Sequence, residues 1–529
     1  MEQLIKNLIK NKVRTERALD LQNRFFLREH KVRMDIPSKK ELLKVYHRLL
    51  KQNKIKEDKD IERLLVKRAI RTQSGVTIIT VLTKPFPCPG KCIYCPDEKR
   101  MPKSYISDEP AAARALLLGF DPFEQVRRRI LTLKENGHPT DKIELIVKGG
   151  SWNAYPINYQ YWFIIRCFQA CNNPKYRKDN SERKPLKKLK EILIQVQNKN
   201  ESATHRIIGL TLETRPDMID EKNINIMRDF GCTRIEMGVQ TTDNRILKDI
   251  KRGHTKDDVF KATKLLKQYG FKVDYHLMPQ LPGSTPAKDL KMMREIFKDS
   301  RFRADMIKIY PCTVIKDTIL YKRLKSGKYK PYSDRKLVDI LKIIKSELPY
   351  YVRISRLIRD IPSHHVKAGN KMTNLRQVIQ NEMIAENMEC SCLRCREIGH
   401  TKLKEIGEPQ LFIDKYISSD GDEYFLSFED KQRKTVFAFC RLRIDKSGIY
   451  PSFIRELHTY GQHIQIGKTQ KKATQHKGMG KELIHEAEKI CKKEKIQSLA
   501  IISGVGVRGY YKKIGYVLED GYMIKKILI

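Results

Sequence analysis

The sequence predicts an α/β fold: a partial barrel of βα units, a smaller mixed α/β domain after it and a small helical region before it. Short β-rich runs alternate with helical stretches between residues 75 and 310, which favours parallel strands joined by crossover helices. After about residue 408 the strands follow one another more closely, which predicts the second domain. Because such barrels carry their sites at the C-terminal ends of the strands, functional residues are expected there.

Residues 1–72 form the predicted N-terminal region, which is helical in pattern and strongly basic. The stretch KKELLKVYHRLLKQNKI places its leucines, Val45 and Tyr46 on one helical stripe, with lysines and arginines opposite. The whole chain has 106 Lys and Arg against 63 Asp and Glu, a formal charge of +43. A polyanionic partner is therefore favoured over an acidic small molecule, and a generally basic or salt-adapted surface is the alternative.

Residues 73–388 form the predicted barrel domain. Six strands are expected, in the segments GVTIITVLT, KIELIVK, HRIIGLTL, TRIEMGV, FKVDYHL and ADMIKIY. A polar, basic insertion at residues 173–190 interrupts this pattern, and it is expected to be a surface loop that leads into a helix.

The compartment is predicted from the first residues and from the cysteines. Residues 1–11 are polar and contain lysine, and no apolar run approaches the ~20 residues of a membrane-spanning helix. We therefore expect a cytoplasmic protein without a membrane partner. In that reducing compartment, the 12 cysteines are metal ligands or core residues rather than disulfides. Those in apolar runs are expected in the core: Cys167, Cys171, Cys232, Cys440 and Cys491.

Three cysteines, Cys88, Cys92 and Cys95, stand close together in KPFPCPGKCIYCPDEKR, directly after the first predicted strand. Three thiolates leave one iron of a 4Fe–4S cluster open to chelate S-adenosylmethionine and cleave it reductively to a 5′-deoxyadenosyl radical. A zinc knuckle, or a site with a distant fourth ligand, is the alternative. The strand-end position favours the cluster, and so does KGGS after the next strand, where Gly149 and Gly150 would let the backbone approach the ligand's amino group.

Polar residues near other strand ends agree with this placement. Glu213 and Arg215 follow the third predicted strand and Glu236 lies in the fourth, so all three are assigned to the cofactor site. A mutually bonded polar layer inside the barrel is the alternative. Lys148 ends the second strand, where a cation could hold a phosphate of coenzyme A or the acetyl carbonyl, or could form a structural ion pair. His276 is interpreted mainly as a core histidine.

Residues 408–529 form the predicted C-terminal domain, whose elements follow the order of a GNAT acetyltransferase. QHKGMG opens a helix, so backbone N–H groups would face a pyrophosphate, and the strand in IRELHTYG would pair with the pantetheine amide. In GYYKKIGY, Tyr510 and Tyr511 start a helix from which a hydroxyl can reach the thioester or thiolate, and simple packing is the alternative. The residues assigned to acetyl-CoA are Glu456, Leu457, His458, Thr459, Gly478, Met479, Gly480, Lys481 and Tyr511.

Residues 389–407 form a cysteine-rich linker between the two domains. Cys390, Cys392 and Cys395 are soft ligands at short spacing, which suits a structural zinc that ties the barrel to the C-terminal domain. Buried reduced cysteines without a metal are the alternative. The candidates for a fourth ligand are Cys312, His364, His365 and His400.

Together these motifs resemble the catalytic subunit of Elongator, in the form that archaea and some bacteria carry as a single protein. From about residue 70 to the end, the family's order is followed by CPGKCIYCP, LTLETRPD, RIEMGVQ, RGHT, KIYPC, RDIPSHHVKAGNKMTNLRQ, RELHTYG, QHKGMG and GYYKKIGY. The resemblance implies a barrel of the radical-SAM type joined to a GNAT-like domain, acting on the wobble uridine in the anticodon stem-loop of tRNA. A local departure is KGGSWNAYP, where many relatives look more like GGTF, which leaves the contacts of Ser151 and Trp152 open.

The resemblance also implies the reaction. Hydrogen is abstracted from the acetyl methyl of acetyl-CoA, the carbon radical adds to carbon 5 of uridine, and thioester hydrolysis gives 5-carboxymethyluridine. Lys148, Tyr510 and Tyr511 are the residues assigned to catalysis. A protein lysine acetyltransferase with an iron–sulfur scaffold is the alternative, and a tRNA-binding module with a degenerate site is a third reading. The electron donor, the tRNA isoacceptors and the formation of a homodimer are left open.

Overall fold

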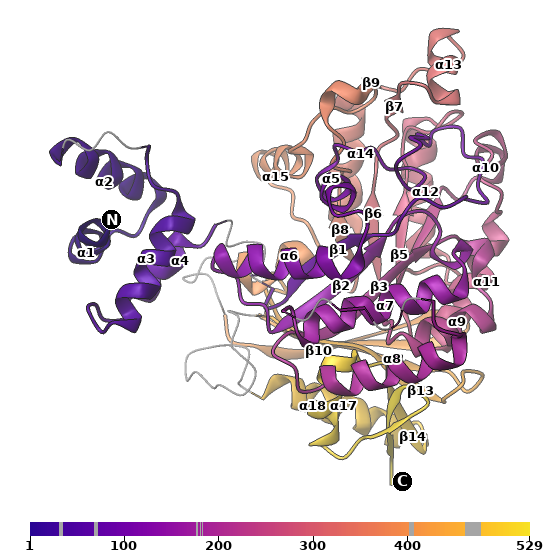
Figure 1. Cartoon of the computed structure of the whole chain (residues 1–529). Helices are drawn as coiled ribbons and strands as arrows, with labels where there is room; N and C mark the ends of the chain where they lie inside the picture. Colours follow the sequence, from indigo (N-terminus) through magenta and orange to yellow (C-terminus); the bar gives the residue numbers. More distant parts are fainter. Residues whose placement is uncertain are drawn as a thin grey trace.

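The computed structural model describes residues 1–30, 35–67, 72, 74–175, 178–179, 181, 183–400, 407–460 and 478–528. The N-terminal helices lie beside the main body, close to the end of α6 (Figure 1). The predicted stripe is buried in their own small core, and Ser38 and Glu41 form a capping box at the start of the third helix. The helices are α1 (Glu2–Lys10), α2 (Glu16–Glu29), α3 (Lys39–Lys51) and α4 (Lys59–Leu65).

The barrel domain contains a seven-stranded sheet in the order β1-β2-β3-β4-β5-β6-β8, and all its neighbouring strands are parallel. This confirms the partial barrel and its six predicted strands, and it adds a seventh strand that was not predicted. The strands are β1 (Thr77–Leu82), β2 (Lys142–Lys148), β3 (Arg206–Thr214), β4 (Arg234–Gln240), β5 (Lys272–Leu277), β6 (Met306–Ile309) and β8 (Arg353–Arg356).

Helices cover the outside of this sheet (Figure 1). Several begin at a proline or a capping side chain, as at Thr255, whose hydroxyl accepts from the backbone N–H of Asp258. The helices of the barrel domain are α5 (Pro110–Leu117), α6 (Pro122–Glu135), α7 (Ile157–Asn172), α8 (Leu186–Asn200), α9 (Glu221–Asp229), α10 (Asn244–Asp249), α11 (Lys256–Gln268), α12 (Pro286–Lys298), α13 (Ile319–Lys325), α14 (Asp334–Glu347) and α15 (Leu375–Ala385). A two-stranded sheet, β7 (Val314–Ile315) with β9 (Val366–Ala368), lies near α5 and α13.

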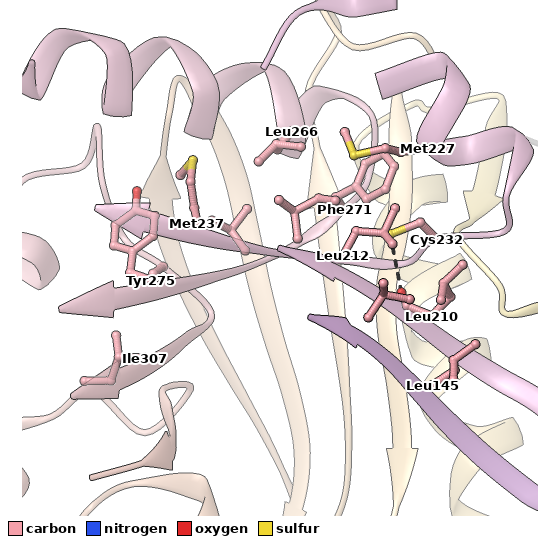
Figure 2. Packing of buried hydrophobic residues seen from close by; sticks show 14 of the residues in the cluster. Leu145, Leu210, Leu212, Met227, Cys232, Met237, Leu266, Phe271, Tyr275 and Ile307 are labelled. Carbon is pink, nitrogen blue, oxygen red and sulfur yellow. Dashed lines mark hydrogen bonds between the residues drawn. The ribbon is translucent and has the colours of Figure 1, made fainter. Parts of the chain in front are cut away.

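The main core fills the space between the sheet and the helices. Figure 2 shows Leu210 and Leu212 of β3 beside Met227 and Cys232, and the Cys232 thiol donates to the Leu210 carbonyl oxygen at 3.4 Å. The five cysteines expected in the core are all buried. The apolar side chains of the strands and of the covering helices therefore pack in one continuous layer, which holds the strand ends in fixed positions.

The C-terminal domain contains a mixed sheet in the order β10-β11-β12-β13-β14-β16-β15, with α17 and α18. Its residues join the core of the barrel domain, and Arg455 binds Asp305 at 2.6 Å and Glu423 at 2.7 Å in full burial, so the two domains share one interior. The elements are β10 (Gln410–Ser418), β11 (Gly421–Glu429), β12 (Val436–Ile444), β13 (Ser452–Thr459), α17 (Met479–Lys493), β14 (Ser498–Ile501), α18 (Arg508–Lys512), β15 (Val517–Glu519) and β16 (Tyr522–Lys526).

The cysteine-rich linker lies between these two parts. Its short helix α16 (Leu393–Arg396) is anchored to the barrel through the Leu393 N–H, which donates to the Val352 carbonyl oxygen. On the other side, Arg396 binds Glu429 of β11 at 2.6 Å. Residues 401–406 of the predicted linker lie outside the described residues. Among the described helices, none combines the length and the apolar character needed to cross a membrane.

Candidate active site

One cavity of about 1120 Å³ runs through the barrel interior, from the cysteine loop at the C-terminal ends of the strands to the C-terminal domain, which packs against the N-terminal ends of the strands. Cys88, Cys92 and Cys95 contribute to its wall on the barrel side. Gly480, Tyr510 and other residues of the predicted acetyl-CoA site contribute to its wall on the C-terminal side. The two sites predicted from separate motifs therefore open into the same space.

The loop between β1 and α5 carries the first three cysteines. The Gly90 N–H donates to the Cys88 sulfur at 3.4 Å, and Arg252 Nη1 donates to the Cys92 sulfur at 3.4 Å. The pKa of Cys92 is lowered to about 4, by a hydrogen bond from Cys95 and by the positive charge of Arg252. Donors that stabilise thiolate sulfurs are what an iron–sulfur ligand set requires.

Arg215 lies beside the same loop. It binds Asp217 at 2.9 Å and the Arg252 carbonyl oxygen at 2.8 Å, while its Nη1 is buried without a hydrogen-bond partner among the described residues. A β-carbon on Gly90 would clash with that atom. Gly90 thus leaves room for an unsatisfied donor at the cavity wall, a feature that fits a polar ligand at this place.

The spacing of the sulfurs separates the cluster from its zinc alternative. Tetrahedral zinc, with Zn–S of about 2.3 Å, needs ligand sulfurs about 3.8 Å apart. Among the described residues, Cys88, Cys92 and Cys95 do not form a group whose ligand atoms all lie within 4.8 Å, whereas Cys390 with its two neighbours does. The three sulfurs of the first triplet are therefore not all gathered at the spacing that a single zinc ion requires.

A network of charged side chains lies inside the barrel, against the cavity. Lys148 binds Glu213 at 3.0 Å and also binds Glu236, and His276 contacts the same two carboxylates at 3.4 and 3.0 Å. Burial opposes the charge of Glu213, but Lys148 and His276 lower its pKa below the usual range. Glu236 is fully buried and does not line the cavity, and Lys308 also binds it. This arrangement matches the mutually bonded polar layer inside the barrel, which was the alternative to a cofactor site.

The two glycines after β2 have different surroundings. Gly149 has a φ of +118°, and an added β-carbon would clash with the Thr83 hydroxyl, so its need for glycine is explained by local packing. Gly149 does not line the cavity. Gly150 has a φ of +60° and does line it, where an added β-carbon would meet only the Tyr155 hydroxyl, at 3.7 Å. Glu213 lies within β3 rather than after it, and Arg215 follows the strand.

On the C-terminal side, β13 separates from β14 toward the cavity. In the described part, β13 pairs with β14 only at Phe453 and Ile454, although it continues to Thr459. One edge of the strand's last residues is therefore free of a strand partner, as the predicted pairing with a pantetheine amide requires. The cavity-lining residues at this edge are Glu456, Leu457, His458 and Thr459.

The helix after this strand begins at the cavity. Gly478 is the N-cap of α17 with a left-handed φ of 85°, and Gly478, Gly480 and Lys481 line the cavity. Residues 461–477, which include the start of QHKGMG, lie outside the described residues. Met479 packs into the core of the C-terminal domain and does not line the cavity, so only its backbone remains in the predicted role.

The two tyrosines of α18 complete this wall. A β-carbon on Gly480 would lie 3.5 Å from the Tyr510 hydroxyl, so Tyr510 reaches the beginning of α17. Tyr511 is buried, which raises its pKa and keeps its hydroxyl protonated at neutral pH. The two rings pack edge to face at 5.2 Å, and both residues line the cavity. Each of the two tyrosines therefore packs against its neighbour and also lines the cavity, so the two roles that were alternatives from sequence occur together.

The second cysteine group corrects one expectation. The sulfurs of Cys390, Cys392 and Cys395 lie within 4.8 Å of one another, but among the described residues none of the four proposed fourth ligands joins them. Lys345 lies there instead, with Nζ at 3.0 Å from the Cys390 sulfur and 3.6 Å from that of Cys395. Cys312 is buried in another cluster, His364 and His365 bind Asp108, and His400 lies 4.0 Å from Glu397.

Several residues at the site were missed by the sequence analysis. Arg252 lies in RGHT, and Lys308 and Tyr310 lie in KIYPC, motifs that were recognised as family features but given no role. Tyr105 and Arg359, which make a cation–π contact of 4.7 Å, also line the cavity; Arg359 opens the motif RDIPSHHVKAGNKMTNLRQ, while Tyr105 lies in none of the quoted motifs. Lys308 lies within β6 and Tyr310 directly follows it, so a motif at a strand end is the signal that could have found these two, whereas Arg252 follows α10 and has no such signal.

The comparisons with known proteins agree with this geometry. The family model described as "Radical SAM superfamily" matches residues 87–296, and that described as "Radical_SAM C-terminal domain" matches residues 304–385. A "tRNA uridine(34) acetyltransferase" of Methanocaldococcus jannaschii is 41% identical over 99% of this chain and 97% of its own length. "Elongator complex protein 3" of Homo sapiens is 35% identical over 87% of this chain and 86% of its own length.

A solved structure leads to the same family. Elp3 of the archaeon Methanocaldococcus infernus, with residues 1–46 deleted, is 40% identical with a TM-score of 0.74, over 86% of this chain and 99% of that one. The agreement includes both the parallel half-barrel and the C-terminal sheet. The chain therefore belongs to the radical SAM family that comprises the tRNA uridine(34) acetyltransferases and Elongator complex protein 3.

Proposed function

We propose that this chain modifies the wobble uridine of tRNA at carbon 5, using acetyl-CoA and a radical derived from S-adenosylmethionine, and that the product is 5-carboxymethyluridine. The observation that carries the proposal is the single cavity onto which both the cysteine loop and the start of α17 open. Transfer of an acetyl carbon from one site to the other needs such a shared, enclosed space, because a reactive carbon radical must be kept from water.

On the barrel side, the chain's own residues hold the cofactors. Cys88, Cys92 and Cys95 are proposed to hold a 4Fe–4S cluster, with Arg252 stabilising the Cys92 thiolate. The unsatisfied Nη1 of Arg215 is available to a polar group of S-adenosylmethionine. When bound, the cluster and S-adenosylmethionine supply the radical that abstracts hydrogen from the acetyl methyl.

The network of charged side chains around Lys148, inside the barrel, is proposed to orient the substrates. Lys148 keeps its charge because two carboxylates surround it, and it lines the cavity. A fixed cation there can polarise the acetyl carbonyl without a rearrangement at the moment of reaction. Glu236 binds Lys148 and His276 but does not line the cavity itself, and it is therefore a positioning residue.

On the C-terminal side, the free edge of β13 and the start of α17 are proposed to bind acetyl-CoA. The backbone N–H groups of Gly480 and Lys481 lie in the first turn of a 15-residue helix, where the helix dipole favours an anion. The edge of β13 after Ile454 offers backbone groups to the pantetheine amides. Together these contacts would deliver the acetyl group toward the barrel.

The tyrosines give a prediction that separates binding from turnover. Tyr511→Phe is expected to leave the affinity for acetyl-CoA unchanged and to lower turnover by roughly 100-fold, because its protonated hydroxyl can donate a hydrogen bond to the thioester carbonyl or to the leaving thiolate. Tyr510→Phe is expected to weaken acetyl-CoA binding more than turnover, since its hydroxyl lies beside Gly480. Steady-state kinetics with acetyl-CoA measure both effects. If both variants keep wild-type kcat, neither hydroxyl acts in catalysis.

The tRNA is proposed to bind chiefly to the basic N-terminal helices and to the 173–190 insertion, of which residues 176, 177, 180 and 182 lie outside the described residues. The helices have their own core and are set apart from the main body (Figure 1). The solved relative with residues 1–46 deleted supports the view that the remainder of the chain folds without them.

Deletion of residues 1–70 is therefore expected to weaken tRNA binding by at least about tenfold and to flatten its salt dependence, because fewer counterions are released on binding. Acetyl-CoA binding should stay at the wild-type level, since its residues lie elsewhere. Filter binding of tRNA at several salt concentrations measures the change. An unchanged affinity for tRNA would assign its binding to the barrel instead.

The linker cysteines are proposed to hold a structural zinc. Three soft thiols within 4.8 Å suit one ion, and Lys345 can donate to the thiolates, which raise its pKa although burial opposes its charge. Cys392→Ser is expected to remove about one zinc per chain and to lower the melting temperature, because the linker contacts both domains. Metal analysis and thermal unfolding measure this. Unchanged zinc content in the variant would contradict the assignment.

The experiment that tests the proposed function is an anaerobic incubation with tRNA, S-adenosylmethionine, acetyl-CoA and a reductant, followed by nucleoside mass spectrometry. Wild-type protein should produce 5-carboxymethyluridine at the wobble position only when all four are present. The alternative, a protein lysine acetyltransferase that shares the acetyl-CoA site, predicts acetyl-lysine without reductant and no modified uridine.

A further inference from the structure

Besides the cysteine loop, three groups of potential metal ligands whose atoms lie within 4.8 Å of one another occur among the described residues, and only one is without a role so far. The linker cysteines form the first, and Glu213, Glu236 and His276 form the second. In the second group Lys148 and Lys308 already neutralise the carboxylates, which leaves little reason for a metal ion. The third group joins the carboxylate of Asp108 to the imidazoles of His364 and His365, and its ligand atoms lie within 4.8 Å of one another.

The geometry of this third group is that of three converging ligands. His365 Nε2 lies 2.8 Å from both carboxylate oxygens of Asp108, and His364 Nε2 lies 3.1 Å from one of them. Ligand atoms at about 2.1 Å from one ion are separated by about 3.0 Å at octahedral angles and about 3.4 Å at tetrahedral angles. The nitrogen–oxygen separation of 3.1 Å lies between these values, and that of 2.8 Å lies just below the octahedral one.

The charge balance also favours a cation. In the part of the chain that the structure describes, Asp108 forms ion pairs with the two histidines and with no lysine or arginine. The nearby Lys367 donates to the backbone carbonyl of His364 at 3.3 Å. Two imidazoles and one carboxylate together form a ligand set that suits zinc and similar divalent ions.

The fold holds these ligands in place from two separate segments. Asp108 precedes α5, while the histidines form a short 3-10 turn, Ser363–His365, directly before β9, and Figure 1 shows α5 and β9 at the same end of the barrel. The adjacent Glu109 binds Arg359 at 2.8 Å, which fastens the same two segments beneath the surface. The ligands thus lie on positions that a partly buried ion pair already brings together.

The place of the group gives it a consequence for the cavity. Glu109 and Pro110 line the cavity on one side of the group, and Ile361 and Val366 line it on the other. The group itself is at the surface, with the side chains of Asp108 and His364 exposed by 45% and 68%. An ion bound there would reach the protein from solvent and would tie together two parts of the cavity rim.

We propose that Asp108, His364 and His365 form a surface site for a divalent transition-metal ion of the zinc type, which fastens the rim of the cavity. The site is separate from the cysteine sites in ligands and in position. No step of the proposed uridine modification depends on it.

Zinc binding to the full-length protein with its cluster intact tests the proposal. The wild type, Asp108→Asn, His365→Gln and the matched control His47→Gln, in which a surface histidine pairs with one carboxylate at 2.8 Å, are dialysed anaerobically against buffered free zinc. Metal content is measured by mass spectrometry. The wild type and the control are expected to hold about one zinc more than the other two variants, in which affinity falls by at least about tenfold. All four proteins keep the linker cysteines and so share that contribution.

Hydrogen–deuterium exchange gives a second readout. Zinc is expected to slow exchange at residues 104–110 and 361–366 in the wild type and the control, and not in Asp108→Asn or His365→Gln. Equal zinc content in the wild type and Asp108→Asn at every free zinc concentration would overturn the proposal. Loss of zinc in the control as well, or zinc-independent exchange at both segments in the wild type, would do the same.

Discussion

Replacing Cys92 by serine is expected to abolish uridine modification and cleavage of S-adenosylmethionine together. The Cys92 sulfur is the thiolate that Arg252 stabilises, and serine oxygen is a much poorer ligand for iron than sulfur. Binding of tRNA and of acetyl-CoA should persist, because their proposed residues lie in other parts of the chain. Iron content measures the loss of the cluster, deoxyadenosine formation measures cleavage of S-adenosylmethionine, and nucleoside mass spectrometry measures uridine modification.

Cys171→Ala is the matched control for this variant. Cys171 is buried in α7 and does not line the cavity, so its loss removes a thiol without touching the cysteine loop. The control should keep its iron and its modification activity, although its stability is expected to fall somewhat. A Cys92→Ser protein that retains the wild-type iron content and produces modified uridine would refute the cluster assignment.

Replacing Gly480 by glutamate is expected to abolish modification while cleavage of S-adenosylmethionine continues. A carboxylate about 4 Å from a pyrophosphate charge, at an effective dielectric constant near 20, costs about 4 kcal/mol, or roughly a thousandfold in affinity. The cysteine loop is unchanged in this variant. Acetyl-CoA binding, deoxyadenosine formation and modified uridine are the three measurements, and only the second should remain.

Gly480→Ala separates the effect of charge from that of bulk. An added β-carbon would meet the Thr459 hydroxyl at 3.4 Å, the Tyr510 hydroxyl at 3.5 Å and Leu457 at 4.0 Å, which are ordinary contacts. Alanine should therefore keep most of the affinity for acetyl-CoA. If Gly480→Glu binds acetyl-CoA as well as Gly480→Ala does, the pyrophosphate does not lie at the start of α17.

The barrel was predictable from sequence because its strands are marked by apolar β-rich runs. β2 coincides with KIELIVK, and β5 lies within FKVDYHL. The seventh strand, β8, has the sequence RISR and only one of its four residues is buried, so it lacks the pattern that identifies the others. Its place at the sheet edge follows from pairing with β6, which depends on the tertiary structure.

The candidate site was predictable where short sequence motifs contain its functional residues. The cysteine spacing and the glycines of QHKGMG pointed to the cavity wall, and the structure adds the contacts. Contacts between distant segments were not predictable. His364 and His365 were considered for zinc with the linker cysteines, yet they meet Asp108, which lies about 256 positions earlier in the chain. Lys345 contacts the linker cysteines from α14, and no local sequence pattern predicts this pairing.

In the proposed reaction, the acetyl carbons pass from the C-terminal domain into uridine through the radical chemistry of the barrel. Acetyl-CoA labelled with carbon-13 in the methyl group, supplied anaerobically with tRNA, S-adenosylmethionine and reductant, tests this directly. The label is expected in the carbon attached to uridine carbon 5 with the wild type, and no labelled nucleoside is expected with Cys92→Ser. Labelled nucleoside from the Cys92 variant at the wild-type rate, or label found only on protein lysines, would contradict it.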